Sequence, residues 1–177
     1  PKGREIYTSA IDPLTQDIYF SNISMIFKFD AKTKKMTHFQ TALDTLKKNN
    51  IISIAFTKDR QLAVKTSSES YLISLNGSYK ELTSFKRLGY AILCDKNNGI
   101  WENYSSSLIC TRNGNTQHLK NLKISTSILT MIEYGKWLVI GTYRDIIFFD
   151  LEEWYRSGKE KYIAYTIGND LNTLEGN

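Results

Sequence analysis

Residues 137–150 read Trp-Leu-Val-Ile-Gly-Thr-Tyr-Arg-Asp-Ile-Ile-Phe-Phe-Asp, two short apolar runs on either side of a polar gap. The runs Trp137–Thr142 and Ile146–Asp150 are rich in β-branched and aromatic residues, which favour strands. A third apolar run, Ile128–Glu133, precedes them across a short polar turn. This stretch therefore predicts three consecutive antiparallel strands joined by tight connections.

The same pattern occurs three more times upstream. The first aliphatic residue of the second predicted strand is Ile18, Leu62, Ile100 and then Leu138, at spacings of 44, 38 and 38 residues. The longer first spacing is explained by the longer connection Gln40–Asn50. A strand pattern repeated at this period indicates stacked structural repeats.

Turn residues separate the predicted strands. Asp95–Gly99 is a strong turn because Asn and Gly tolerate the positive φ that tight hairpins require, and Asn76-Gly77 and Asn113-Gly114 precede fourth strands. In the last repeat, Asp150 followed by Glu153 resembles a capping box and predicts a short helical turn within Asp150–Lys159. The predicted strands are Tyr7–Ile11, Ile18–Phe20, Met25–Asp30, Ile51–Thr57, Leu62–Thr66, Tyr71–Leu75, Tyr79–Phe85, Tyr90–Cys94, Ile100–Tyr104, Leu108–Arg112, Gln117–Leu122, Ile128–Glu133, Trp137–Thr142, Ile146–Asp150 and Tyr162–Ile167.

Four antiparallel strands in about 40 residues form the unit of a β-propeller blade. The sequence therefore predicts an all-β fold, a partial β-propeller of about four blades of four-stranded antiparallel sheet, at about 4–40, 51–86, 90–123 and 128–168. A β-sandwich is the alternative, and the regular repeat favours the propeller. Because end blades expose an apolar face, we expect self-association or further propeller blades in a longer parent chain.

Composition narrows the function classes. The chain has 177 residues, 41% of them hydrophobic, which is typical of a globular protein with a sizeable core. The net charge of +5 favours an acidic partner or is simply a solvated lysine-rich surface. No apolar run approaches the ~20 residues of a membrane helix, and scattered basic residues predict no nucleic-acid binding. The chain begins at Pro1 without an initiator Met, so we expect a piece of a longer protein.

The second-strand motifs resemble a known family. Gly99-Ile100-Trp101 and Trp137–Thr142, followed by Ile146–Asp150, are similar to the regulator-propeller repeat, whose second strand reads approximately G-x-I-W-I-G-T. Ile51–Phe56 looks like its opening strand, and Asn169–Asn172 resembles the linker before a new repeat, as though a fifth blade began after residue 177. Ser70, Ser107 and Asp145 stand where that repeat has glycine before its third strand.

The resemblance implies a function. Regulator-propeller repeats are typical of the periplasmic sensor regions of hybrid two-component system proteins, where tandem propellers recognise oligosaccharides. It implies a periplasmic, ligand-sensing segment, with any histidine kinase activity elsewhere in the parent chain. A protein-interaction propeller scaffold and, less favoured, a carbohydrate-active propeller enzyme are the alternatives.

Sequence motifs for catalysis are missing. His38 and His118 lie in different repeats, without a nearby cysteine or paired carboxylate, and are predicted to be solvated or packed on strands. Cys94 and Cys110 fit no metal spacing and are too few for a disulfide framework. The sequence shows no phosphate loop and no nucleophile elbow. We therefore predict no enzyme in this segment, no cofactor and no metal.

The candidate ligand site comes from the connections that open on one face of a propeller. Those before a first strand and those between strands two and three carry cations and aromatic rings, which would suit an acidic oligosaccharide. Solvated loop lysines are the alternative. Trp101 and Trp137 are predicted to be core, and Trp154 is predicted either to be exposed or to pack locally. The candidate binding residues are Lys47, Lys48, Lys86, Arg87, Tyr104, Lys123, Tyr143 and Arg144.

Overall fold

The computed structural model describes residues 6–41, 50–83, 89–104, 107–124, 126–166 and 173–176. The chain divides into two compact units. Unit 1 comprises residues 1–88 and 92–100, and unit 2 comprises residues 89–91 and 101–177.

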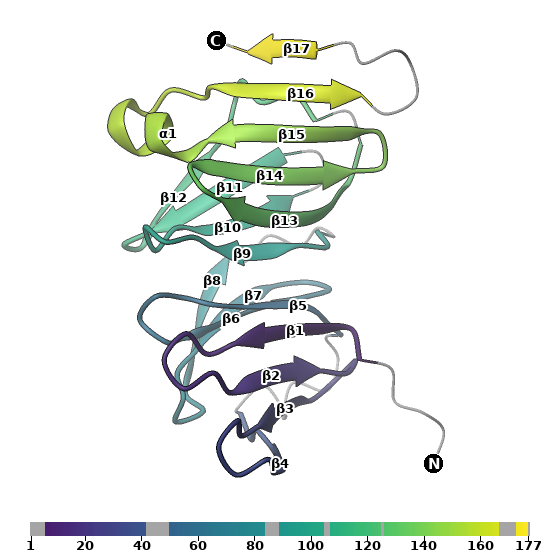
Figure 1. The fold of residues 1–177 in the computed structure, drawn as a ribbon, viewed down its shortest axis with the longest axis vertical. Helices are drawn as coiled ribbons and strands as arrows, with labels where there is room; N and C mark the ends of the chain where they lie inside the picture. The colour runs from purple at the N-terminus through teal and green to yellow at the C-terminus, as the bar shows by residue number, and fades with distance from the viewer. Residues whose placement is uncertain are drawn as a thin grey trace. The chain divides into compact units, whose positions relative to one another are not determined.

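The described residues form four antiparallel sheets whose strands follow one another along the chain (Figure 1). The first is β1-β2-β3-β4, with β1 Thr8–Ile11, β2 Ile18–Ser21, β3 Ile26–Phe29 and β4 Met36–His38. The second is β5-β6-β7-β8, with β5 Ile51–Phe56, β6 Leu62–Thr66, β7 Ser70–Ile73 and β8 Tyr79–Thr83. The third is β12-β11-β10-β9, with β9 Ile92–Cys94, β10 Ile100–Tyr104, β11 Ser107–Arg112 and β12 Asn115–His118. The fourth is β13-β14-β15-β16-β17, with β13 Ile128–Tyr134, β14 Trp137–Thr142, β15 Asp145–Asp150, β16 Tyr162–Thr166 and β17 Thr173–Gly176.

The prediction of about four sheets of four antiparallel strands is confirmed, with differences in detail. Strand β12 is Asn115–His118 rather than Gln117–Leu122, because Asn113 and Gly114 adopt positive φ and close a two-residue hairpin that pairs Arg112 with Asn115. The fourth sheet also has a fifth strand, β17, for which the sequence predicted no strand. It pairs antiparallel with β16 and satisfies backbone groups on the edge of that strand.

In unit 1, the first two sheets pack face to face through one apolar cluster. Tyr19 makes edge-on ring contacts with Phe39 and Phe56, at centroid distances of 5.1 and 5.0 Å. On the other face of the second sheet, Ala63 packs in a second buried apolar cluster with Ile92 and Ile100. The second sheet therefore buries both of its faces, as a stacked repeat requires. The buried residues of the first cluster are Tyr19, Ile26, Ile51, Ile54, Leu62, Val64, Tyr71 and Ile73.

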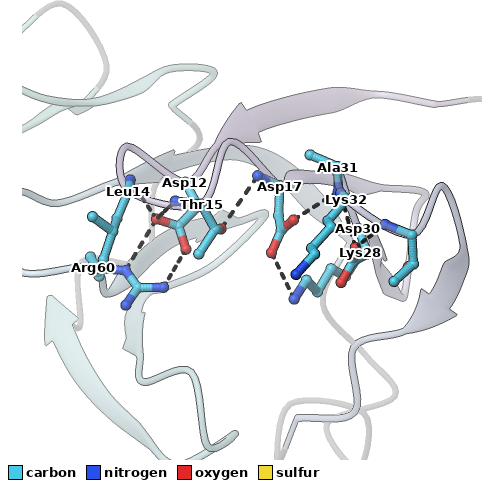
Figure 2. Close-up of polar contacts among 10 residues, drawn as sticks. Asp12, Leu14, Thr15, Asp17, Lys28, Asp30, Ala31, Lys32 and Arg60 are labelled. Atoms are coloured by element: carbon cyan, nitrogen blue, oxygen red, sulfur yellow. Dashed lines mark hydrogen bonds and ion pairs between the residues drawn. The ribbon is translucent and has the colours of Figure 1, made fainter.

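A polar network also joins the turns of these two sheets (Figure 2). Asp12, in the β1–β2 turn and only 1% exposed, accepts from the N–H of Leu14 at 2.9 Å and from Nε and Nη2 of Arg60 at 3.1 and 2.7 Å. Burial opposes ionisation, but these hydrogen bonds outweigh it and lower the pKa of Asp12 to about 2. The hydrogen bond from Lys28 at 2.7 Å similarly lowers the pKa of the Asp17 carboxyl.

In unit 2, one face of the fourth sheet is fully buried. Leu138, Ile140, Ile147 and Phe149 are at most 1% exposed. The buried ring of Trp101 lies edge-on to Phe149 with centroids 5.6 Å apart, so the prediction of a core tryptophan at this position is confirmed.

The insertion of the fourth sheet is the helix α1, Leu151–Ser157, drawn between β15 and β16 in Figure 1. Asp150 is its N-cap and accepts from the N–H of Glu153 at 3.0 Å, which confirms the predicted helical turn. Trp154 is buried and its ring lies 6.3 Å from that of Trp101, so of its two predicted roles local packing is correct. Gly158 ends the helix with φ of 73°, in the left-handed region.

The opposite face of the fourth sheet carries a continuous apolar row. Ile132, Val139, Phe148 and Ile163 stand opposite one another in the register of β13 to β16. Ile132 is 55% exposed, and the neighbouring Tyr134 on the same face is 71% exposed. Within the described part of unit 2, this face is therefore open to solvent.

Candidate functional site

The hairpins between strands two and three are closed by a repeated side-chain cap. Thr142 Oγ1 accepts from the backbone N–H groups of Arg144 and Asp145, at 3.1 and 2.8 Å. Thr66 and Asn22 make the same pair of bonds to the residues two and three places further along. Such local caps hold a turn without contributions from its tip residue. The Thr of the predicted Ile-Gly-Thr motif therefore fixes the backbone that carries Arg144.

Arg144 lies at a cavity of about 530 Å³ inside unit 2. Its walls come from β11, β15, β16 and the connection 119–124 that follows β12, here called the connector. The volume is in the range of small-ligand pockets. The lining residues are Ser107, Leu119, Lys120, Leu122, Lys123, Ile124, Arg144, Asp145, Ile147, Ala164 and Thr166.

The connector is fixed by a buried carboxylate. Glu160, only 8% exposed, accepts from the N–H groups of Lys120, Asn121 and Leu122 at 2.7, 2.6 and 2.8 Å. Three consecutive amides directed at one carboxylate hold the backbone in a single conformation. Glu160 therefore positions the backbone that carries Lys120 and Lys123, although it does not line the cavity itself.

The cavity is positively charged. Lys120, Lys123 and Arg144 are exposed at its lining and face one acid, Asp145. The Asp145 carboxylate already accepts from Thr166 Oγ1 at 2.9 Å. Three cations in one concave site bind an anion better than isolated surface lysines do, because each adds to the same local potential.

Two of the eight predicted site residues, Lys123 and Arg144, meet at this cavity. Tyr143, at the same hairpin tip, is 71% exposed and does not line the cavity, and Tyr104 is a half-buried residue at the end of β10 outside the lining. These assignments as ligand contacts stay predictions. The remaining four, Lys47, Lys48, Lys86 and Arg87, lie outside the described residues.

Lys120 was missed from the sequence because the predicted strand Gln117–Leu122 placed it in a sheet rather than in a connection. The strand ends at His118, which leaves Lys120 on the connector. Glu160 was missed because its partners are backbone amides 38 to 40 residues away, for which the sequence has no signal.

The described residues contain no group of three or more His, Cys, Asp or Glu residues that could hold a metal ion. Cys94 is half-buried and Cys110 is buried, and His38 and His118 are exposed on strands of different sheets. No described helix combines the length and the apolar character that crossing a membrane requires.

Several solved structures share this fold. The extracellular domain of a hybrid two-component system from B. thetaiotaomicron matches with a TM-score of 0.64 at 17% identity, over 99% of this chain and 23% of that one. An auxiliary nutrient binding protein from Bacteroides thetaiotaomicron matches with a TM-score of 0.72 at 11% identity, over 97% of this chain and 42% of that one. Virginiamycin B lyase from Staphylococcus aureus matches with a TM-score of 0.62 at 14% identity, over 98% of this chain and 56% of that one.

These matches confirm the predicted fold class: the chain is a segment of a β-propeller, of the kind found in the extracellular domains of hybrid two-component systems. The chain spans from about a quarter to just over half of the length of the structures compared. No protein-family model and no curated protein matches the sequence. At these identities the likeness defines the fold and not the ligand.

Proposed function

We propose that this segment is the ligand-binding part of an extracytoplasmic, periplasmic sensor and that its ligand is an acidic oligosaccharide. The observation that carries the proposal is the cavity of unit 2, where Lys120, Lys123 and Arg144 face a single acid. Guanidinium and ammonium groups are the donors that sugar carboxylates and sulfates bind. Buried apolar side chains such as Leu122 and Ile147 form part of the wall of the same cavity.

The fold supports the sensing part of the proposal. Structures with the same arrangement of sheets include extracellular domains of hybrid two-component systems and nutrient binding proteins. A lyase also has this fold, so a turnover assay on the same sugars accompanies each binding measurement. We propose that this segment binds without catalysing a reaction and that any kinase lies elsewhere in the parent protein.

The open face of the fourth sheet points to a second kind of partner. Ile132, Val139 and Phe148 form an apolar surface like those that pack between sheets in unit 1. We propose that a further sheet of the same repeat covers this face in the working protein. In the isolated 177-residue chain, the open apolar face of a second copy takes its place.

The binding proposal is tested by calorimetry with two trisaccharides, one neutral (maltotriose) and one acidic (trigalacturonate). Arg144→Ala and Lys123→Ala should each weaken trigalacturonate binding about three- to ten-fold, the range for single solvent-accessible charge contacts. Added salt should weaken it further. Lys159→Ala is the matched control, because Lys159 is an exposed lysine of unit 2 outside the cavity.

Two results would contradict the proposal. Equal binding of both sugars, or equal losses for both in the variants, would show that the cations do not select the ligand. Binding of neither sugar would contradict an oligosaccharide ligand and favour the alternative of a protein-interaction scaffold.

A further inference from the structure

Unit 2 contains a second cavity, of about 350 Å³, that shares no lining residue with the first. It lies between the β11–β12 hairpin and α1 together with the C-cap of that helix. The hairpin contributes Arg112, Asn113, Asn115 and Gln117, and the helix contributes Trp154 and Tyr155. The volume is at the lower end of the range of ligand pockets, which corresponds to a molecule the size of a monosaccharide or an amino acid.

Both walls of this cavity are held by contacts that do not involve a ligand. Trp154 anchors α1 through its contacts with Trp101 and Phe149, at centroid distances of 6.3 and 5.9 Å. The hairpin is closed by Asn113 and Gly114, both with positive φ. Strands three and four of the other three sheets are joined by turns rather than by a helix, so the stacking of sheets does not require this cavity.

One charged side chain, the guanidinium of Arg112, lines the second cavity. Arg112 is exposed, and its Cζ lies 4.7 Å from the centroid of the Tyr155 ring. Among the described residues no carboxylate forms an ion pair with Arg112, and no acid lines the cavity. Stacking on an aromatic ring holds a guanidinium by its plane and leaves the N–H groups at its edge available for hydrogen bonds.

The remaining lining is suited to neutral polar groups. Asn113, Asn115 and Gln117 each carry an amide that both donates and accepts hydrogen bonds, and all three are exposed. One planar cation surrounded by amides matches a carboxylate on an otherwise uncharged polar molecule. A doubly charged phosphate would leave one charge without a partner in this cavity.

We propose that this second cavity is a binding site for a small carboxylate-bearing molecule of monosaccharide or amino-acid size, held by Arg112 and the neighbouring amides. The site is separate from the cavity of Lys123 and Arg144, and it takes a single carboxylate rather than an extended acidic chain.

The test uses two pairs of compounds in which one member carries a carboxylate and the other an uncharged polar group at the same position: glucuronate with glucose, and N-acetylalanine with its amide. Binding is measured by calorimetry and by the shift of the tryptophan indole N–H signals in NMR, because Trp154 lines the cavity. We expect at least one carboxylate to bind and its uncharged counterpart to bind at least ten-fold more weakly. Arg112→Gln should weaken binding of the carboxylate compound about ten-fold or more. Arg112→Lys should weaken it by less, because lysine keeps the positive charge but not the two parallel N–H donors of the guanidinium.

Two control variants separate this site from others. Arg156→Gln changes an exposed arginine of α1 outside the cavity, and Arg144→Ala changes the first cavity. Both should leave the binding of the small carboxylate unchanged. Equal binding of acid and neutral compound, full binding by a folded Arg112→Gln variant, or binding by none of the four compounds would overturn the proposal.

Discussion

The buried carboxylate of Glu160 offers the sharpest test of how the first cavity is built. Its Oε2 accepts from the N–H groups of Asn121 and Leu122, and its Oε1 accepts from that of Lys120. In Glu160→Gln, one of these oxygens becomes an NH₂ group, which cannot accept a hydrogen bond. At least one backbone N–H then loses its acceptor and faces another donor in a buried place.

The expected cost follows from these bonds. A hydrogen bond to a charged group contributes about 1.5–3 kcal/mol, and a buried donor without an acceptor costs about 1–3 kcal/mol. We therefore expect Glu160→Gln to lower the free energy of unfolding of unit 2 by about 2–4 kcal/mol. Backbone amides 120–122 should also exchange their hydrogens faster, because they have lost their shared acceptor.

Urea unfolding followed by tryptophan fluorescence measures this loss selectively, since Trp101, Trp137 and Trp154 all belong to unit 2. Glu152→Gln is the matched control, because Glu152 is an exposed glutamate of α1. If the two variants unfolded within about 0.5 kcal/mol of each other and amide exchange at 120–122 were unchanged, Glu160 would not hold the connector.

Two further predictions concern the acid response and the open face. Asp12 has a pKa of about 2 in the folded chain against 3.8 ordinarily, so its contribution to stability is complete above about pH 4 and is lost as the pH falls towards 2. Arg60→Ala should raise that pKa and move acid unfolding of unit 1 to higher pH, which circular dichroism along a pH titration measures; an unchanged curve would refute it. Ile132→Asp should reduce self-association of the chain by placing a charge on the open face, which analytical ultracentrifugation measures; a wild-type chain that stays monomeric at high concentration would contradict it.

The repeated strands could be predicted from the sequence because alternation and turn chemistry are local. Leu62–Thr66 and Trp137–Thr142 begin and end as predicted, since each is bounded by polar turn residues. The meeting of Lys123 and Arg144 could be anticipated from the rule that these connections open on one face. The role of Glu160 could not, because its partners are backbone groups, which every sequence contains.

The wrong end of the predicted strand Gln117–Leu122 also comes from hydrogen bonds between parts of the chain that are distant in sequence. The N–H of Leu119 still donates to the carbonyl of Leu108 in β11, but the next three amides donate to the Glu160 carboxylate rather than to a neighbouring strand, and the chain leaves the sheet there. The apolar residues Leu119 and Leu122 are nevertheless buried, so the pattern there looks like a strand. Hydrophobic periodicity records burial, and it cannot tell which group accepts the backbone hydrogen bonds.

The hairpin caps have a consequence for how such a protein can change over time. Because Asn22, Thr66 and Thr142 hold their turns from one end, the tip residues that follow them are not needed to keep the backbone in place. Mutation can therefore sample new side chains at the tips while the scaffold stays constant, as happens in a combinatorial library built on a fixed frame. Position 144 is one such tip position, and exchanging the residue there offers a direct route to re-engineering what this surface selects.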